Sequence, residues 1–241
     1  MEGSIAMAKA FLARGTCRIA ATPHVNDRWG VRLDELRESF RALQTALSQE
    51  ASGLEVEFGA EIALVTAVEL PDAELASFTL GGGDWLMIES PSYGTRASVH
   101  AMIYSIQSRG FHVLLAHPER SQIFQEEIEF LSSLVAGGVR TQLTASAVSG
   151  RFGRSAQETA RIMLDRNLAH VVASDAHDAT RRPPGIADQL RGSGHSDMIR
   201  WLCQDMPTWI LDGGEEPSRP ANIRGSGDGA QGILGRLGLR R

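Results

Sequence analysis

Five short segments of this 241-residue chain each end in a residue whose side chain can bind a metal ion. The segments are mostly apolar and are separated by helix-like stretches, which is typical of buried parallel strands. The carboxyl ends of such strands meet at one edge of a sheet, where α/β barrels carry their chemistry. We therefore predict that the end residues gather in one site. The segments are residues 18–24, 56–61, 85–89, 113–117 and 170–177.

The candidate ligands are imidazoles and carboxylates. Asp175 and His177 leave the last segment two residues apart, so their side chains can point to the same side. A carboxylate that ends a buried strand, as Glu61 and Glu89 do, is costly unless it binds a metal or meets a cation. Taken singly, each carboxylate has an alternative as a solvated loop residue or, for Asp175, as a helix cap. Together the donors favour zinc, manganese or iron at two or more sites, with the ligands His24, Glu61, Glu89, His117, Asp175 and His177.

Arginines follow two of these ligands closely. Arg120 comes three residues after His117, in the segment AHPER. Arg181 and Arg182 lie on the loop after the Asp-His doublet, just before two prolines. A guanidinium group can grip a phosphate through two parallel hydrogen bonds, although each of these arginines could also be ordinary solvated surface. Their positions beside the ligands predict an anion clamp next to the metal site.

Helical periodicity fills the stretches between the apolar segments. Leu36, Phe40, Leu43 and Leu47 form one apolar stripe. Gly15 stands where an opening helix would end, so the chain is expected to begin with a helix and not a strand. Repeated strands and helices with short loops favour one parallel sheet or barrel. The predicted helices cover residues 4–13, 33–49, 99–108, 126–136 and 156–166.

The composition excludes some classes of function and indicates the domain organisation. A net charge of −5 offers no diffuse cationic surface to a nucleic-acid backbone. Cys17 and Cys203 are too few and too far apart in sequence to suggest a disulfide framework or a thiolate zinc site. There is no membrane-span-like stretch or signal peptide, so we expect a cytoplasmic protein. We predict one domain over residues 1–217 and a disordered tail, rich in Gly, Pro, Ser and Arg, over 218–241.

The motifs and their order resemble those of a known family. It comprises the metal-dependent bacterial protein-tyrosine phosphatases of the PHP superfamily, which act in the control of capsule and exopolysaccharide synthesis. The resemblance covers about residues 1–217 and implies a distorted TIM-like barrel that holds two or three divalent ions, with manganese, iron and zinc as candidates. The motifs are TPH at 22–24, GAE at 59–61, IES at 88–90, AHPER at 116–120, GRFG at 150–153, and SDAH with RRPP within 174–184.

The resemblance also implies a reaction and a role for each candidate residue. Phosphotyrosine on a protein would be hydrolysed by a metal-activated hydroxide, without a phosphoenzyme. The partner would be a phosphotyrosine protein, for example a bacterial tyrosine kinase of polysaccharide export. Arg120 and Arg182 would contact the phosphate. The metal ligands would be His24, Glu61, Glu89, His117, Asp175 and His177.

The sequence departs from the family pattern at its amino end. The family begins with a strand carrying a His-x-His pair and with an acidic loop, and this sequence has neither. We therefore expect a barrel without its first strand, either because the start codon was assigned too late or because the protein is a shortened paralogue. We also expect incomplete metal binding and weak hydrolysis of aryl phosphates. Two alternatives stay open. One is a noncatalytic protein that docks a kinase or an export partner, and the other is a phosphoesterase for a small molecule such as histidinol phosphate.

Overall fold

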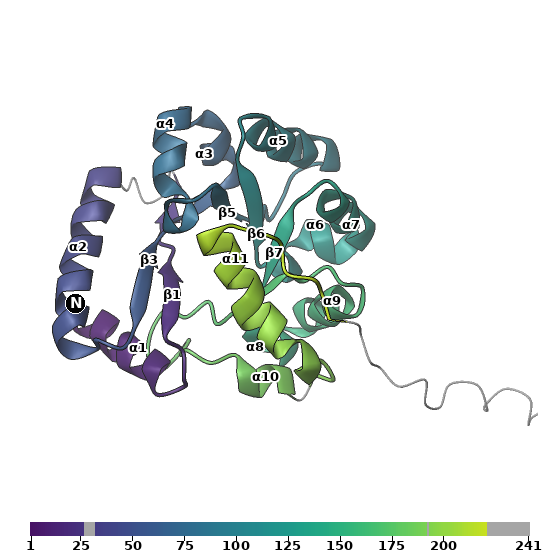
Figure 1. Cartoon of the computed structure of the whole chain (residues 1–241). Helices are drawn as coiled ribbons and strands as arrows, with labels where there is room; N and C mark the ends of the chain where they lie inside the picture. The colour runs from purple at the N-terminus through teal and green to yellow at the C-terminus, as the bar shows by residue number, and fades with distance from the viewer. Residues whose placement is uncertain (27–31, 192, 221–241) are drawn as a thin grey trace, which may run out of the picture.

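The structure is a computed structural model that describes residues 1–26, 32–191 and 193–220. Strands and helices alternate along most of the chain (Figure 1). Residues 221–241, most of the predicted tail, lie outside the described ranges. No helix within those ranges is both long and apolar enough to cross a membrane.

The described strands form two parallel sheets. A small sheet pairs β1 (Arg18–Ala21) with β3 (Glu55–Phe58). The larger sheet has the strand order β2-β4-β5-β6-β7-β8, and every neighbouring pair in it is parallel. Its strands are β2 (His24–Val25), β4 (Glu61–Ala63), β5 (Trp85–Glu89), β6 (His112–Ala116), β7 (Arg140–Thr144) and β8 (Val171–Ala173).

The first two predicted strands each break into two. Hydrogen bonds bridge the breaks, from the Gly59 N–H to the Ala21 carbonyl at 3.1 Å and from the Glu61 N–H to the Pro23 carbonyl at 3.0 Å. A Cβ atom on Gly59 would lie 2.6 Å from Cδ2 of Leu80, so the missing side chain leaves room for that buried leucine. The breaks thus separate the small sheet from the strands that carry the first two candidate ligands.

The helices follow the predicted order. The opening helix α1, the long helix α2 and the later helices α5, α7 and α9 cover the stretches with helical periodicity, so these predictions are confirmed. The helices are α1 (Glu2–Leu12), α2 (Leu33–Glu50), α3 (Leu64–Glu69), α4 (Asp72–Leu75), α5 (Arg96–Ser108), α6 (Gln122–Glu126), α7 (Ile128–Ala136), α8 (Ala145–Val148), α9 (Arg154–Asp165), α10 (Ala187–Arg191) and α11 (Met206–Asp212). Short 3-10 turns are η1 (Ala76–Phe78), η2 (Leu80–Gly82), η3 (Pro118–Arg120) and η4 (Ser196–Met198), and η5 (Trp201–Asp205) is a π-helical turn.

The predicted α/β class with a parallel sheet is confirmed, but a closed barrel is not seen. The larger sheet has β2 and β8 as its two edges, and no ladder joins these edges among the described residues. Within the described residues, the larger sheet is therefore open. The strand β7, which lies between β6 and β8, was not among the five predicted strands.

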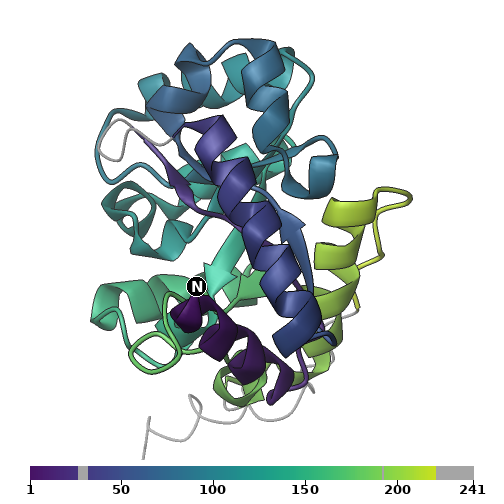
Figure 2. The same cartoon turned by 90° about the vertical axis from the view of Figure 1, so that its left-hand side faces the viewer.

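The apolar core falls into two clusters. The main one lies between the larger sheet and its covering helices and includes the fully buried Ile62, Leu86, Leu115 and Leu143. The second lies between α1, α2 and the small sheet, where Phe11, Leu47 and Val56 belong to one buried group. Figure 2 shows α2 lying beside α1 on this side of the molecule.

The amino end of the larger sheet carries a second set of polar contacts. The Arg219 guanidinium donates to the carbonyls of Asn167 and Ala169 at 3.2 and 3.1 Å, and its carbon lies 4.4 Å from the Trp201 ring centre. Arg140, the first residue of β7, forms two hydrogen bonds with the Glu216 carboxylate. The segment after α11 therefore packs across the start of the last two strands. We call Arg140, His170, Trp201, Glu216 and Arg219 the amino-end cluster.

Candidate metal centre

Three of the predicted ligands form a compact group at one end of the sheet. His24 and Glu61 are register partners at the start of β2 and β4, and Glu89 ends the neighbouring strand β5. One potential ligand atom from each of the three lies within 4.8 Å of the other two. Parallel pairing brings these residues together even though they are far apart in sequence. The local arrangement is thus that of an ion site with one imidazole and two carboxylates.

His117 joins this group through Glu61. Its Nε2 lies 2.7 Å from Oε1 of Glu61, and both side chains are buried. His117 follows β6 and has a left-handed backbone with φ of 36°, which turns the chain into η3. Burial opposes ionisation of both groups, but the hydrogen bond and opposite charge lower the pKa of Glu61 and raise the pKa of His117. The two therefore form a buried ion pair next to His24.

His24 offers a direct test of whether the group suits a metal. Its Nδ1 atom is buried, yet it has no hydrogen-bond partner among the described residues. The Glu61 Oε1 atom lies 3.9 Å away, beyond hydrogen-bond range. Buried polar atoms are rarely left without a partner, and a metal ion is one that would complete this site. The nitrogen and oxygen donors fit a divalent ion of the zinc, manganese or iron type.

Asp175 accepts hydrogen bonds from Arg120 and Arg182, two of the arginines that were predicted to bind an anion. Arg120 Nη1 donates to Oδ2 of Asp175 at 2.7 Å, and Arg182 Nη2 donates to the same oxygen. Asp175 is nearly buried and has a left-handed backbone with φ of 49°, two residues after the end of β8. His177 Nδ1 lies 3.7 Å from Oδ1 of Asp175, and its ring centre is 6.2 Å from that of His24. One carboxylate thus connects the two arginines, and His177 lies between it and the compact group.

The structure brings the predicted residues together to different degrees. His24, Glu61 and Glu89 form the compact group, and His117 contacts it directly. Asp175 is paired with Arg120 and Arg182 and does not belong to the compact group. The structure thus brings the predicted residues together in part, and His24 and Glu61 begin β2 and β4, where the sequence had predicted that they end strands. The separate roles of the predicted residues as ligands and phosphate contacts stay predictions.

The match to a family model shows to which family this chain belongs. The model described as "Capsular polysaccharide synthesis, CpsB/CapC" matches residues 1–195, most of the chain. The chain belongs to the CpsB/CapC family. The resemblance to metal-dependent tyrosine phosphatases of capsule synthesis is thereby confirmed at the level of the family.

Individual CpsB/CapC relatives carry consistent names. The tyrosine-protein phosphatase YwqE of Bacillus subtilis (strain 168) is 33% identical over 182 residues, which cover 74% of this chain and 71% of YwqE. The putative tyrosine-protein phosphatase CapC of Staphylococcus aureus is 29% identical over 183 residues, covering 75% of this chain and 71% of CapC.

A solved structure shares the fold of this CpsB/CapC chain. It comes from work on YwqE of Bacillus subtilis and CpsB of Streptococcus pneumoniae, described as unique metal-dependent tyrosine phosphatases. The TM-score is 0.73 at 26% identity, and the match covers 91% of this chain and 92% of the other. The likeness therefore extends beyond the stretch matched by the family model.

Two residues of the CpsB/CapC site were not singled out from the sequence. Phe152, in the GRFG motif, lies under both Arg120 and Arg182, with guanidinium carbons 4.5 and 5.7 Å from its ring centre. Glu119 is fully buried, accepts a hydrogen bond from the Thr144 N–H at 3.0 Å, and has its pKa raised to about 7 by burial. Both lie inside quoted motifs, which was the available signal, but neither is a strand-end residue.

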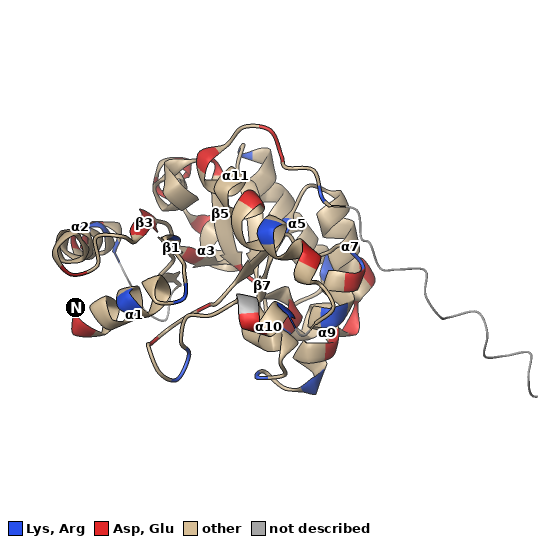
Figure 3. Ribbon diagram, turned by 60° about the horizontal axis from the view of Figure 1, so that its bottom comes forward, with Lys and Arg blue, Asp and Glu red and all other residues tan. Residues whose placement is uncertain are grey.

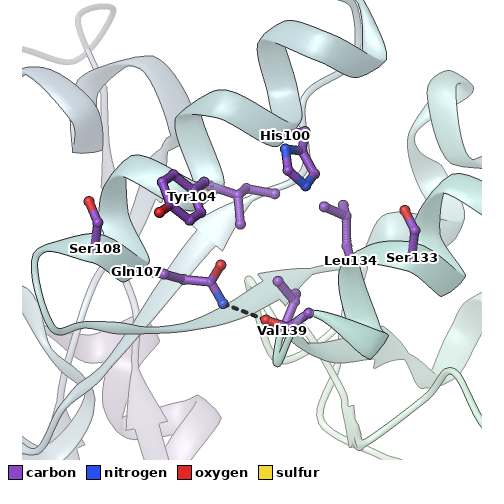
Figure 4. Close-up of a pocket in the computed structure, with 9 residues that line it drawn as sticks. His100, Tyr104, Gln107, Ser108, Ser133, Leu134 and Val139 are labelled. Carbon is purple, nitrogen blue, oxygen red and sulfur yellow. Dashed lines mark hydrogen bonds between the residues drawn. The ribbon is translucent and has the colours of Figure 1, made fainter.

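A surface hollow of about 540 Å³ lies away from the candidate metal centre of this CpsB/CapC chain. Figure 4 shows it between α5 and α7, with His100 and Tyr104 on one side and Ser133 and Leu134 on the other. It shares no residue with the candidate site. Figure 3 shows that basic and acidic residues are interspersed over the described helices.

Proposed function

We propose that this chain is a metal-dependent phosphatase that hydrolyses phosphotyrosine on proteins in the control of capsular polysaccharide and exopolysaccharide synthesis. The observation that carries the proposal is the juxtaposition of the His24, Glu61 and Glu89 group with two arginines that meet at Asp175. A phosphate ester needs both features, since its transition state carries negative charge that metals and guanidinium groups stabilise. The names of the CpsB/CapC relatives support the same reaction and substrate.

We assign the six predicted ligands to two or three divalent ions, with manganese, iron and zinc as candidates. When bound, such ions lower the pKa of water and neutralise charge on phosphoryl oxygens. Glu61 and His117 neutralise each other as an ion pair, and His117 must give up its proton before its nitrogen can bind a metal. Metal affinity should therefore rise with pH through the raised pKa of His117. The proposed ligands are His24, Glu61, Glu89, His117, Asp175 and His177.

Arg120 and Arg182 are proposed to bind the phosphoryl group. Their side chains are partly exposed, at 29% and 26%, whereas Asp175 between them is 11% exposed, so a ligand from solvent can reach them. Each guanidinium presents a planar set of donors that matches two phosphate oxygens. The tyrosine side chain would leave as its phenolate, which takes a proton from solvent.

We further propose that the parallel sheet is part of a distorted barrel of the PHP type, formed by residues 1–217. The substrate we favour is a phosphotyrosine protein, such as a bacterial tyrosine kinase of polysaccharide export. The support is that Glu89 ends β5 and His117 follows β6, so part of the candidate site lies at the carboxyl ends of parallel strands, where barrel enzymes hold their chemistry.

The test is hydrolysis of p-nitrophenyl phosphate and of a phosphotyrosine peptide by metal-stripped protein, with manganese, iron or zinc added back. We expect activity only with metal, and a loss of at least about 100-fold in the Glu61→Gln variant, which keeps the side-chain shape. The matched control is Glu74→Gln on the exposed surface of α4, which should behave as wild type. Activity that resists chelation and is equal in Glu61→Gln would refute the proposal.

Substrate choice is tested with the same protein. Rates on phosphotyrosine peptides are compared with rates on small aliphatic phosphate esters, histidinol phosphate among them. We expect phosphotyrosine to be preferred. A higher kcat/KM for a small ester would replace the proposed substrate while leaving the metal chemistry in place.

A further inference from the structure

We propose that Phe152 is a positioning residue that holds Arg120 and Arg182 side by side as one phosphate clamp, an inference that rests on the proposed function. The guanidinium carbons lie 4.5 and 5.7 Å from the centre of the Phe152 ring. Both distances are within the range in which a cation is attracted to an aromatic face. One ring therefore contacts two cations that come from different segments of the chain.

The need for such a contact follows from the way the arginines are paired. Both donate to the same oxygen of Asp175, which neutralises part of their charge. Asp175 is also a proposed metal ligand, and an oxygen that binds a metal is a weaker acceptor for two arginines. Two like charges would then repel each other before phosphate arrives. The Phe152 ring does not depend on Asp175, so it can keep both arginines in place throughout.

The backbone around Phe152 is arranged to fix the ring. Gly150 and Gly153 have left-handed φ angles of 85° and 91°, which reverse the chain on both sides of it. A Cβ on Gly150 would meet the Gln157 amide at 3.2 Å, and that amide donates to the Val148 carbonyl at 3.0 Å. The turn is thus held against the start of α9, and the ring is partly buried against the main core.

A second contact joins this turn to the loop that carries Arg182. The Arg151 guanidinium donates to the carbonyl of Arg181, the residue next to Arg182. The ring and one of its two cations therefore lie on segments that are tied to each other. This link makes the Phe152 ring a fixed platform for the clamp.

The experiment compares Phe152→Leu with Phe152→Tyr, which keeps an aromatic face. Phe152→Leu should raise the KM for p-nitrophenyl phosphate and the inhibition constant of inorganic phosphate about tenfold, with a smaller effect on kcat. Phe152→Tyr should restore both constants to within about threefold of wild type. Manganese affinity should be unchanged in both, because the ring touches the arginines and not the compact ligand group. Any fall in melting temperature should be no larger than in Phe111→Leu. Phe111→Leu is the matched control, since Phe111 is also partly buried against the main core.

Three results would overturn the proposal. The first is a Phe152→Leu variant with wild-type constants. The second is equal impairment in Phe152→Leu and Phe152→Tyr. The third is a weaker phosphate interaction that simply follows a lower melting temperature. If wild-type protein hydrolyses no phosphate ester, the proposed function fails on its own. The clamp is then tested by calorimetric binding of inorganic phosphate to the manganese-loaded wild type and to the same variants, where Phe152→Leu should still bind about tenfold more weakly.

Discussion

The two ends of the parallel sheet use charged residues in different ways. At the amino end, Arg140 donates two hydrogen bonds of 2.9 and 2.7 Å to the Glu216 carboxylate, which pairs with no other cation among the described residues. At the carboxyl end, Arg120 and Arg182 share a single oxygen of Asp175. Paired charges with complete hydrogen bonding stabilise a fold, whereas shared or unpaired groups are available to a ligand. The difference separates an end that holds the chain together from the end at which we propose that metal and phosphate bind.

The buried histidines make the same distinction. His170, in the amino-end cluster, accepts a hydrogen bond from the Thr141 N–H, and burial lowers its pKa to about 3. His117, at the carboxyl end, has its pKa raised because the charge of Glu61 outweighs the effect of burial. One histidine is kept neutral and structural. The other is held charged in a pair that a metal ion can replace.

The largest expected effect is on activity, from Asp175→Asn. This change removes the charge that joins the arginines to the proposed metal site, and kcat/KM should fall by at least about 1000-fold. The matched control at the other end of the molecule is Asp212→Asn, which breaks the pair between Asp212 and Arg18. Because that pair lies on the surface, its loss should change stability little and leave kcat/KM unchanged. Steady-state assays and urea denaturation measure the two quantities, and similar losses of activity in both variants would break the comparison.

The next effect is on stability, from Trp201→Ala in the amino-end cluster. Trp201 is 3% exposed, and removal of its ring should lower the free energy of unfolding by about 3 to 5 kcal/mol. The Arg219 guanidinium would also lose the aromatic face against which it lies. Activity per folded molecule should be unchanged at a temperature where the variant is folded. Urea denaturation and the assay decide this, and a lowered kcat with unchanged stability would contradict the assignment.

Replacing arginine by lysine at each end should give opposite results. Arg182→Lys keeps the charge but loses the planar donor set, so kcat/KM should fall roughly 10- to 100-fold with little change in stability. Arg219→Lys loses one of two carbonyl contacts and the stacking on Trp201, so stability should fall by about 1 kcal/mol with unchanged kcat/KM. Each variant serves as the control for the other. If both lost activity equally, the two ends would not be functionally distinct.

The last expected effect is on the pH dependence of stability and is due to His170. Its folded pKa of about 3 lies below the ordinary value of 6.5, so its stabilising contribution is full above pH 6.5 and is lost as the pH falls. Between pH 6.5 and pH 5 this loss should be roughly 2 kcal/mol. His170→Gln should remove that part of the pH dependence, while His100→Gln, at an exposed position, should keep it. Urea denaturation at several pH values tests this, and equal slopes in all three proteins would count against it.

The sequence predicted several of the buried strands that alternate with helices. The apolar segment at Trp85–Glu89 became β5 with the predicted bounds, because its short apolar run and its end residue are both local features. The strand β7 (Arg140–Thr144) was not predicted, since it ends in a threonine and lacks a metal-binding side chain. The sequence pattern therefore found the strands that carry ligands better than the strands that only complete the sheet.

The contacts between site residues could not be predicted in the same way. The pairing of Arg120 with Asp175 joins residues that are 55 positions apart, and no local pattern encodes it. The position of Phe152 under two arginines depends on how two loops pack, and the burial of Glu119 depends on β7 lying next to it. Motif types indicated which residues matter, and the packing of distant segments determined which of them touch.

The central claim is that the carboxyl end of the sheet binds the divalent metal used in hydrolysis. Calorimetric titration of manganese into metal-stripped protein tests it most directly, using wild type, His117→Ala and, as control, Asp212→Asn. We predict saturable binding by wild type and Asp212→Asn, with binding lost or at least about 10-fold weaker in His117→Ala. No saturable binding by wild type, or equal binding by all three proteins, would contradict the claim.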